Sequence, residues 1–143
     1  MTKLTQNLLF YIAGPSNEKM KRDLKRIAKN LANNTKWLIK APDFVNESEK
    51  ATKPGDLDIE TVGLLLNIYS AYPPSIITFE EDKKCFEEVN LILNHISEYS
   101  TKNSLSFELE LDGVFVGSIN NGVFDNTLKK GLLEPWEQAL SNQ

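Results

Sequence analysis

The chain has 143 residues, of which 41% are apolar and 25% are charged, so we expect a globular domain and not a disordered chain. One cysteine excludes an internal disulfide and a cysteine-based zinc cage, and no apolar run reaches the roughly 20 residues that span a bilayer. We therefore expect a cytoplasmic protein that neither crosses a membrane nor carries a cofactor.

Charge is divided unevenly along the sequence. Residues 1–55 contain 11 of the 16 Lys and Arg but only 5 of the 20 Asp and Glu, a formal charge of +6. Residues 56–143 contain the other 5 cations and 15 anions, a charge of −10. This asymmetry indicates a partner with a charged surface. Nearly all the cations are lysines, which lack the planar fork that suits phosphate and guanine, so we do not expect a nucleic-acid partner.

The first forty residues predict two strands and a helix. Residues 7–13 are apolar and end at Gly14-Pro15, which is typical of a buried strand. Apolar residues spaced four, three and four apart then predict a helix over 16–33, and residues 36–40 predict a second strand. If the two strands are neighbours in one sheet, their connection should be right-handed.

The middle of the chain predicts a long loop and two helices. Residues 41–57 are polar and show no period, which is typical of a connection or of a functional loop. Asp58 can cap a helix that ends at Tyr72-Pro73-Pro74, and residues 75–79 predict a short edge strand. Acidic residues from Glu80 onward favour the first turn of a further helix, whose apolar stripe should face the core.

The last forty residues predict a β-hairpin and a terminal helix. Residues 106–111 and 114–119 alternate in polarity and are joined by Asp112-Gly113, the pair preferred in a two-residue type I′ turn. Asp125 can cap a short helical turn, and the final helix should start or kink at Pro135.

The predicted hairpin register assigns each side chain to a face. Pairing across the turn sets Leu111 opposite Val114 and Leu109 opposite Val116. One face of the hairpin then carries Glu108, Glu110, Phe115 and Ile119. Either the helix around Trp136 covers the two apolar groups, or this face is a recognition patch.

Together these elements predict a single α+β domain over residues 1–143. We expect a mixed or antiparallel sheet of about four strands that includes the C-terminal β-hairpin and is flanked by three or four helices.

No set of residues suggests catalysis or metal binding. His95 is the only histidine and is expected on a helix surface, and Cys85 is expected to be an inert thiol without a base. Asp56, Asp58 and Glu60 lack the glycine and the bidentate glutamate of a calcium loop. We therefore predict no catalytic residue and no metal site.

The densest acidic segment lies at the start of the helix predicted from residue 80. It can be a solvated helix start or an anionic surface that meets a partner. We predict a protein-binding surface formed by this segment and the outward face of the hairpin. Its residues are Glu80, Glu81, Asp82, Glu87, Glu88, Glu108, Glu110, Phe115 and Ile119.

The opening segment Phe10-Tyr11-Ile12-Ala13-Gly14-Pro15 resembles the first strand and turn of nucleoside 2-deoxyribosyltransferases. That resemblance implies a doubly wound parallel sheet and a nucleoside-processing enzyme. The family's later Asp-Ser-Gly-Thr-like turn and nucleophilic glutamate have no counterpart in this chain, so no catalytic residue is carried over.

The C-terminal stretch from Glu110 to Trp136 is similar to the tails of small bacterial proteins, some of which look like immunity proteins of toxin systems. The matching residues include Asp112-Gly113, Gly117-Ser118, Gly122, Asp125 and Gly131-Leu132-Leu133. This resemblance implies a non-catalytic inhibitor that binds a basic toxin domain through an acidic surface. An oligomeric accessory domain that uses the hairpin edge is a further alternative.

Overall fold

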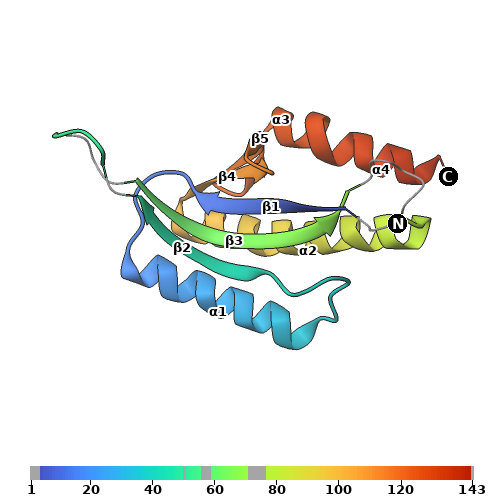
Figure 1. The fold of residues 1–143 in the computed structure, drawn as a ribbon, viewed down its shortest axis with the longest axis horizontal. Helices are drawn as coiled ribbons and strands as arrows, with labels where there is room; N and C mark the ends of the chain where they lie inside the picture. The colour runs from blue at the N-terminus through green and yellow to red at the C-terminus, as the bar shows by residue number, and fades with distance from the viewer. Residues whose placement is uncertain (1–3, 50, 56–58, 71–76, 143) are drawn as a thin grey trace.

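The structure is a computed structural model that describes residues 4–49, 51–55, 59–70 and 77–142. Its elements are β1 (Thr5–Ile12), α1 (Glu18–Asn34), β2 (Asp43–Glu49), β3 (Ile59–Tyr69), α2 (Phe79–Asn103), β4 (Ser106–Leu111), β5 (Val114–Asn120), β6 (Val123–Phe124), α3 (Asn126–Leu128), the π-helical turn η1 (Lys129–Leu133) and α4 (Glu134–Ser141). The strands form one sheet in the order β2-β3-β1-β4-β5-β6, and every neighbouring pair is antiparallel (Figure 1). The predicted α+β class is confirmed, with two more strands than expected.

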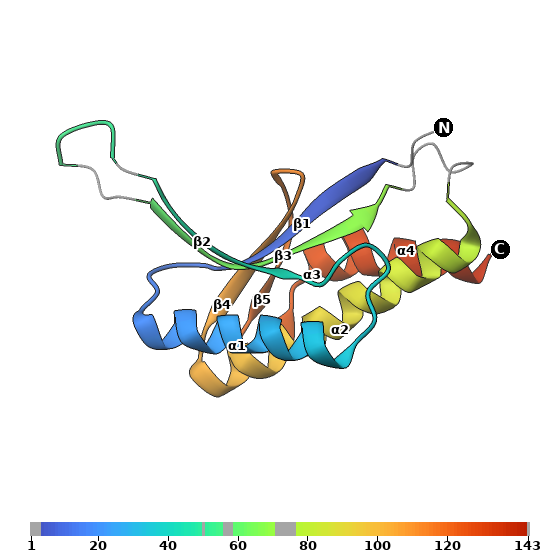
Figure 2. The same ribbon diagram turned by 60° about the horizontal axis from the view of Figure 1, so that its bottom comes forward.

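The helices lie on one side of this sheet (Figure 2). Helix α1 buries Leu24 and Leu31, and α2 buries a stripe that runs from Cys85 to Tyr99. These side chains meet the inward residues of the central strands, including Phe10, Leu64 and Leu109, each of which is fully buried. Apolar burial of this kind is the main stabilising contribution to the fold. No helix in the described part of the chain covers the opposite face of the sheet.

The segment from residue 59 to 69 is strand β3, so the predicted helix was wrong. Val62, Leu64, Leu66 and Ile68 are buried in alternation, which is the period of a strand. Apolar residues also occupy outward positions such as Leu65, so the sequence fitted a helical spacing as well as a strand. The proposed cap Asp58 and the segment Tyr72-Pro73-Pro74 lie outside the described residues.

The predicted loop over 41–57 contains strand β2, and the strand predicted over 36–40 is absent. Residues 36–40 are held instead by side chains: the Trp37 indole donates to the Leu31 carbonyl at 3.0 Å, and the Leu38 amide donates to Glu88 at 2.7 Å. The strand-helix-strand unit with a parallel crossover was therefore also wrong. Of the edge strand predicted over 75–79, the described residues 77–79 form no strand, and Phe79 begins α2.

Several local predictions are confirmed. Helix α2 begins at Phe79 with Glu80, Glu81 and Asp82 in its first turn, as expected. The structure adds a capping box, in which the Thr78 hydroxyl accepts from the Glu81 amide and the Glu81 carboxylate accepts from the Thr78 amide. Asp112 and Gly113 have positive φ angles of 50° and 83°, as a type I′ turn requires. Asp125 caps α3, and α4 begins at Glu134, next to Pro135.

A β-bulge changes the predicted hairpin register. Leu111 pairs with Val114 as expected, but Leu109 pairs with Gly117 because Val116 is inserted as an extra residue. Gly117 has a φ of 152°, and a Cβ there would lie 2.3 Å from the Leu128 Cβ, so the bulge needs glycine.

The bulge reverses the facing of the residues that follow it. Ile119 pairs with Phe107 and is fully buried, so its predicted outward position was wrong. Phe115, which precedes the bulge, keeps its outward position and is 46% exposed.

Candidate functional site: the acidic face of the sheet

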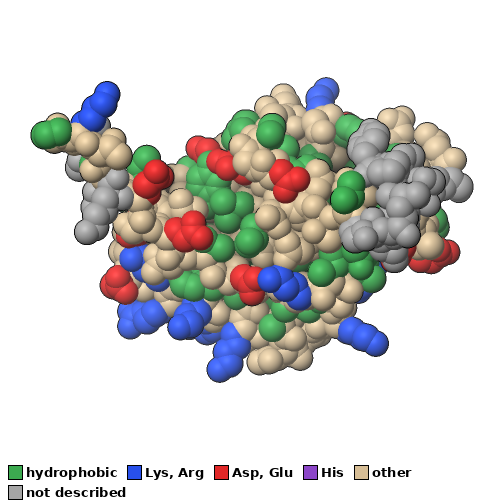
Figure 3. All heavy atoms as spheres, viewed as in Figure 1, with side chains coloured by type: hydrophobic (Ala, Val, Ile, Leu, Met, Phe, Trp, Pro, Cys, Tyr) green, Lys and Arg blue, Asp and Glu red, His purple; other side chains and the backbone are tan. Residues whose placement is uncertain are grey.

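The uncovered side of the sheet presents one continuous surface from β2 to β5. Residues paired across antiparallel strands point to the same side, so the register identifies its members. We call this surface the acidic face; it is formed by Asp43, Val45, Glu47, Glu49, Ile59, Thr61, Gly63, Leu65, Asn67, Asn7, Leu9, Tyr11, Glu108, Glu110, Phe115 and Ser118. Figure 3 views this side and shows acidic groups around apolar ones.

The six strands contain no Lys, Arg or His at all. Of their six carboxylates, Glu60 points toward α1, where it pairs with Lys21, and its hydrogen bond from Ser16 helps to lower its pKa. The other five belong to the acidic face. Asp43 at its margin pairs with Lys40 at 2.8 Å. No Lys or Arg of the described chain lies within ion-pairing distance of the remaining four, which are Glu47, Glu49, Glu108 and Glu110.

Tyr11 stands between two of these carboxylates. Its hydroxyl oxygen lies 2.9 Å from Glu108 Oε2 and 2.8 Å from Glu110 Oε2. A phenol has a single proton and can donate to one of them at a time, so the pair retains acceptor capacity. Partial burial and the hydrogen bonds to Glu110 and Glu108 raise the pKa of Tyr11, which stays protonated. The arrangement is suited to accept further donors from a cationic group.

The acidic face is hollowed on both sides of this cluster. One hollow of about 300 Å³ has Leu9, Val45 and Leu65 among its lining and is bordered by Glu47 and Glu110. A second, of about 630 Å³, lies beside Tyr11 and Glu108 and extends to the turn over residues 12–16 and to β3. The surface therefore combines apolar depressions with acidic borders, which is typical of a recognition surface.

Two features fix the backbone beneath the acidic face. The Asp112 carboxylate accepts from the Asn7 amide at 2.8 Å, and the Asp112 amide donates to the Asn7 carbonyl at 2.9 Å, which ties the hairpin tip to β1. Gly63 pairs with Tyr11, and a Cβ at Gly63 would lie 1.9 Å from the Phe10 carbonyl oxygen. Strands β1 and β3 thus approach closely where Tyr11 is held.

The acidic residues predicted on α2 have mainly structural contacts. Glu81 belongs to the capping box, and Asp82 accepts from the Trp136 indole at 2.8 Å. Glu88 is 2% exposed, and its burial raises the pKa of its carboxyl group. The hydrogen bond that it accepts from the Leu38 amide lowers this pKa but does not offset the effect of burial. Glu80 and Glu87 are exposed. Because α2 covers the other side of the sheet, these residues do not join the acidic face.

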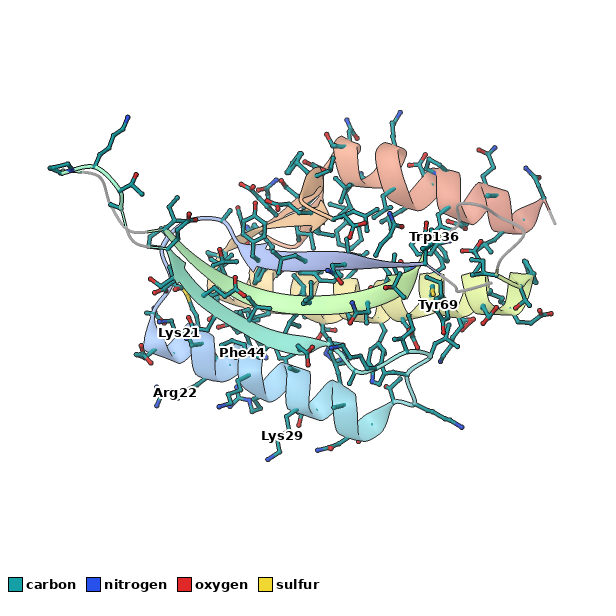
Figure 4. The ribbon with its side chains drawn as sticks, in the orientation of Figure 1. Lys21, Arg22, Lys29, Phe44, Tyr69 and Trp136 are labelled. Carbon is teal, nitrogen blue, oxygen red and sulfur yellow. The ribbon has the colours of Figure 1, made fainter. Side chains whose placement is uncertain are left out.

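The predicted surface is thus only partly assembled. Glu108, Glu110 and Phe115 share the acidic face, whereas Ile119 is in the core. The Trp136 ring packs on Phe86 at a centroid distance of 5.2 Å, on the helix side and near Tyr69 (Figure 4), so it does not cover Phe115.

Sequence reasoning missed the contribution of β1, β2 and β3, including Tyr11, Leu65 and Glu47. The available signal was the complete lack of cations in these segments, but it becomes visible only once residues 43–49 and 59–69 are recognised as strands.

A third hollow, of about 520 Å³, lies between α1 and α2 beside His95. Its buried acid, Asp23, accepts from Tyr99 at 2.8 Å and pairs with Lys19 at 2.9 Å and Arg26 at 3.0 Å. The Lys19 ammonium is the main cause of a lowered Asp23 pKa, and Tyr99 adds to it. These partners give Asp23 a structural role that joins the two helices.

Other site chemistry is limited in the part of the chain that the structure describes. Burial raises the pKa of the Cys85 thiol to about 11, so the thiol is a poor nucleophile. No group of three or more His, Cys, Asp or Glu among these residues is placed to hold a metal ion. None of their helices has the length and apolarity that a membrane crossing requires.

The C-terminal residues on which the expected resemblance to immunity proteins rests lie at a turn, a bulge and a helix cap. Asp112-Gly113 makes the turn, Gly117 makes the bulge, and Asp125 Oδ1 accepts from both the Ser118 amide at 3.1 Å and the Leu128 amide at 2.8 Å. The parallel sheet implied by the deoxyribosyltransferase resemblance is absent, since all the described strand pairs are antiparallel. Comparison with protein-family models, curated proteins and solved structures finds no match for the chain.

Proposed function

We propose that this chain is a non-catalytic protein-binding protein, an immunity-type inhibitor that neutralises a bacterial toxin in the cytoplasm. The acidic face carries the proposal: five carboxylates and no cation lie on a sheet surface that no helix of the described chain covers. A solvated sheet face seldom combines depressions lined by leucine and valine with charges of a single sign.

The distribution of charge supports a basic partner. Helix α1 carries six Lys and Arg, and Figure 4 shows Arg22 and Lys29 on its side away from the sheet. The acidic face points the other way, so a basic toxin surface is attracted to this face and repelled by α1. Such complementarity orients the encounter and raises the association rate.

The first test is functional rescue. The neighbouring gene is expressed in a sensitive host with and without this chain, and growth is measured. Binding of its tagged product to the purified chain is then measured at low and at high salt. We expect rescue of growth, and an association rate that falls steeply as salt increases. If the neighbouring product is not a basic toxin, and low-salt capture from the native host recovers no protein partner, the proposal is wrong.

A nucleoside-processing enzyme is the second candidate. In its favour, the hollow of about 630 Å³ adjoins the turn over residues 12–16 and has two carboxylates, Glu60 and Glu108, in its lining. Incubation with deoxynucleosides and free bases, followed by chromatography, distinguishes the two functions. Base exchange that is lost in a Glu108→Gln variant would favour the enzyme.

A further inference from the structure

The carboxylates of the acidic face form two rows. One row lies on β2 and contains Asp43, Glu47 and Glu49, and the other lies on β4 and contains Glu108 and Glu110. Strands β3 and β1 separate them, so the rows are three strand spacings apart, about 14 Å. Leu9 and Leu65, which pair with each other, lie between the rows.

One hollow brings both rows together around an apolar floor. The depression of about 300 Å³ is bordered by Glu47 from the first row and Glu110 from the second, with Leu9, Val45 and Leu65 between them. An occupant of this depression must therefore be apolar where it meets the floor and cationic on both of its flanks.

An α-helix meets these dimensions. With its side chains it is roughly 10–12 Å wide, so an apolar stripe can rest on the floor while lysine or arginine stems on its two flanks extend to rows about 14 Å apart. An extended strand alternates its side chains between two opposite sides, so a strand whose apolar residues rest on the floor would point its lysines away from both rows. A helix on this face would also supply the second covering layer that the sheet lacks.

We propose that the partner segment that binds the acidic face is an amphipathic α-helix whose apolar stripe is flanked on both sides by Lys or Arg. This inference rests on the proposed protein-binding function and specifies its partner. The Tyr11 hydroxyl lies within hydrogen-bonding distance of both Glu108 and Glu110, so one row presents two adjacent carboxylates to a single cationic side chain.

The test uses two labelled synthetic peptides of about 18 residues, built from the same Leu, Ala and Lys residues. The first has helical order, with the leucines on one stripe and lysines on both flanks; the second has strand order, in which apolar residues and lysines alternate. Fluorescence anisotropy measures binding to the full chain, and circular dichroism measures the helix content of the bound peptide. We expect the helical peptide to bind at least about tenfold more tightly and to gain helix on binding.

Charge variants locate the binding surface. Glu47→Gln/Glu49→Gln and Glu108→Gln/Glu110→Gln each remove two charges from one row. Each glutamine keeps one side-chain oxygen as an acceptor, so Tyr11 retains a partner. Each pair should weaken helical-peptide binding by about tenfold, because both rows contact the helix. The matched control, Glu80→Gln/Glu87→Gln on exposed positions of α2, should change it by less than about twofold.

Three results would overturn the inference. They are equal or tighter binding of the strand-order peptide, equal effects of the face and control variants, and a concentration-dependent dimer that blocks the peptide at the acidic face. If the toxin found by growth rescue binds the face variants as tightly as the wild type, this inference fails while the proposed function stands. If the peptide behaves as expected but the chain rescues no growth and captures no toxin, the proposed function fails, and the inferred preference of the acidic face for a basic helix is supported.

Discussion

Gly63→Ala tests the close approach of β1 and β3 on which the position of Tyr11 depends. The added Cβ would lie 1.9 Å from the Phe10 carbonyl oxygen and 2.7 Å from the Tyr11 Cα. An ordinary carbon–oxygen contact is about 3.3 Å, so the strands must separate locally by about 1.4 Å. A ladder hydrogen bond of about 2.9 Å would then stretch beyond 4 Å and no longer count as one.

The resulting loss of stability follows from the bonds beside Gly63. At least two ladder bonds in the centre of the sheet would break, and leaving their groups unpaired costs about 1–3 kcal/mol each. We therefore expect the free energy of unfolding to fall by about 2–6 kcal/mol and Tm to fall by roughly 4–24 °C.

Urea unfolding followed by tryptophan fluorescence measures this change, with Gly131→Ala as the matched control. Gly131 is exposed in η1, and an added Cβ would meet no atom within 4 Å. The control should leave stability unchanged or raise it by about 0.4–1 kcal/mol, because alanine restricts the unfolded chain. A Gly63→Ala protein within about 1 kcal/mol of the wild type would refute the close approach.

Three further predictions concern buried groups. Glu88→Gln keeps an acceptor for the Leu38 amide and removes a carboxyl group whose pKa is raised by burial. Because the folded-state pKa is raised, the stability of the wild type falls as pH rises above 4.5, and the variant should gain stability relative to the wild type between about pH 4 and pH 7. Identical urea midpoints of the two proteins across this range would contradict the argument. Tyr99→Phe removes the hydroxyl that donates to Asp23 and should lower the free energy of unfolding by about 1–2 kcal/mol at neutral pH. Because the pKa of Asp23 is lowered, this difference in stability should disappear as pH falls from 3.8 through the folded-state pKa. Acid titration of the stability of both proteins checks this. Cys85 is 1% exposed with a pKa of about 11, so native protein should resist iodoacetamide at pH 8 and react once unfolded in urea, whereas rapid native labelling would show that the thiol is accessible.

The elements that could be predicted from the sequence are those that local interactions decide. Helix α2 has an acidic first turn, a capping box and a long apolar stripe, and the β4–β5 hairpin has its Asp-Gly turn. In both cases neighbouring residues carry the information, so no distant contact was needed.

Strand β3 could not be identified in this way because it is apolar on both sides. Val62, Leu65, Leu66 and Tyr69 satisfy a helical spacing, while Val62, Leu64, Leu66 and Ile68 satisfy the alternation of a strand. Pairing with β1 and β2 selects the strand, and that pairing is non-local. Because the sequence predicted β3 as a helix, it offered no strand for the polar β2 segment to pair with, and that segment was predicted as a loop.

The charge asymmetry also has a different meaning in three dimensions. Along the sequence it separates a basic first part from an acidic second part, yet Asp43, Glu47 and Glu49 belong to the first part and lie on the acidic face. In the folded chain the contrast is between α1, which carries six Lys and Arg, and the sheet, whose strands carry none.

The sequence by itself determined the α+β class, helix α2, the hairpin turn and the uneven charge, because these depend on composition and on residues close in the chain. Only the tertiary structure decided that Glu108 and Glu110 meet Tyr11, that three carboxylates of β2 join their face, and that Ile119 turns inward. Strand pairing brings residues about a hundred positions apart within hydrogen-bonding distance, and one bulge residue reverses the facing of the β5 side chains that follow it.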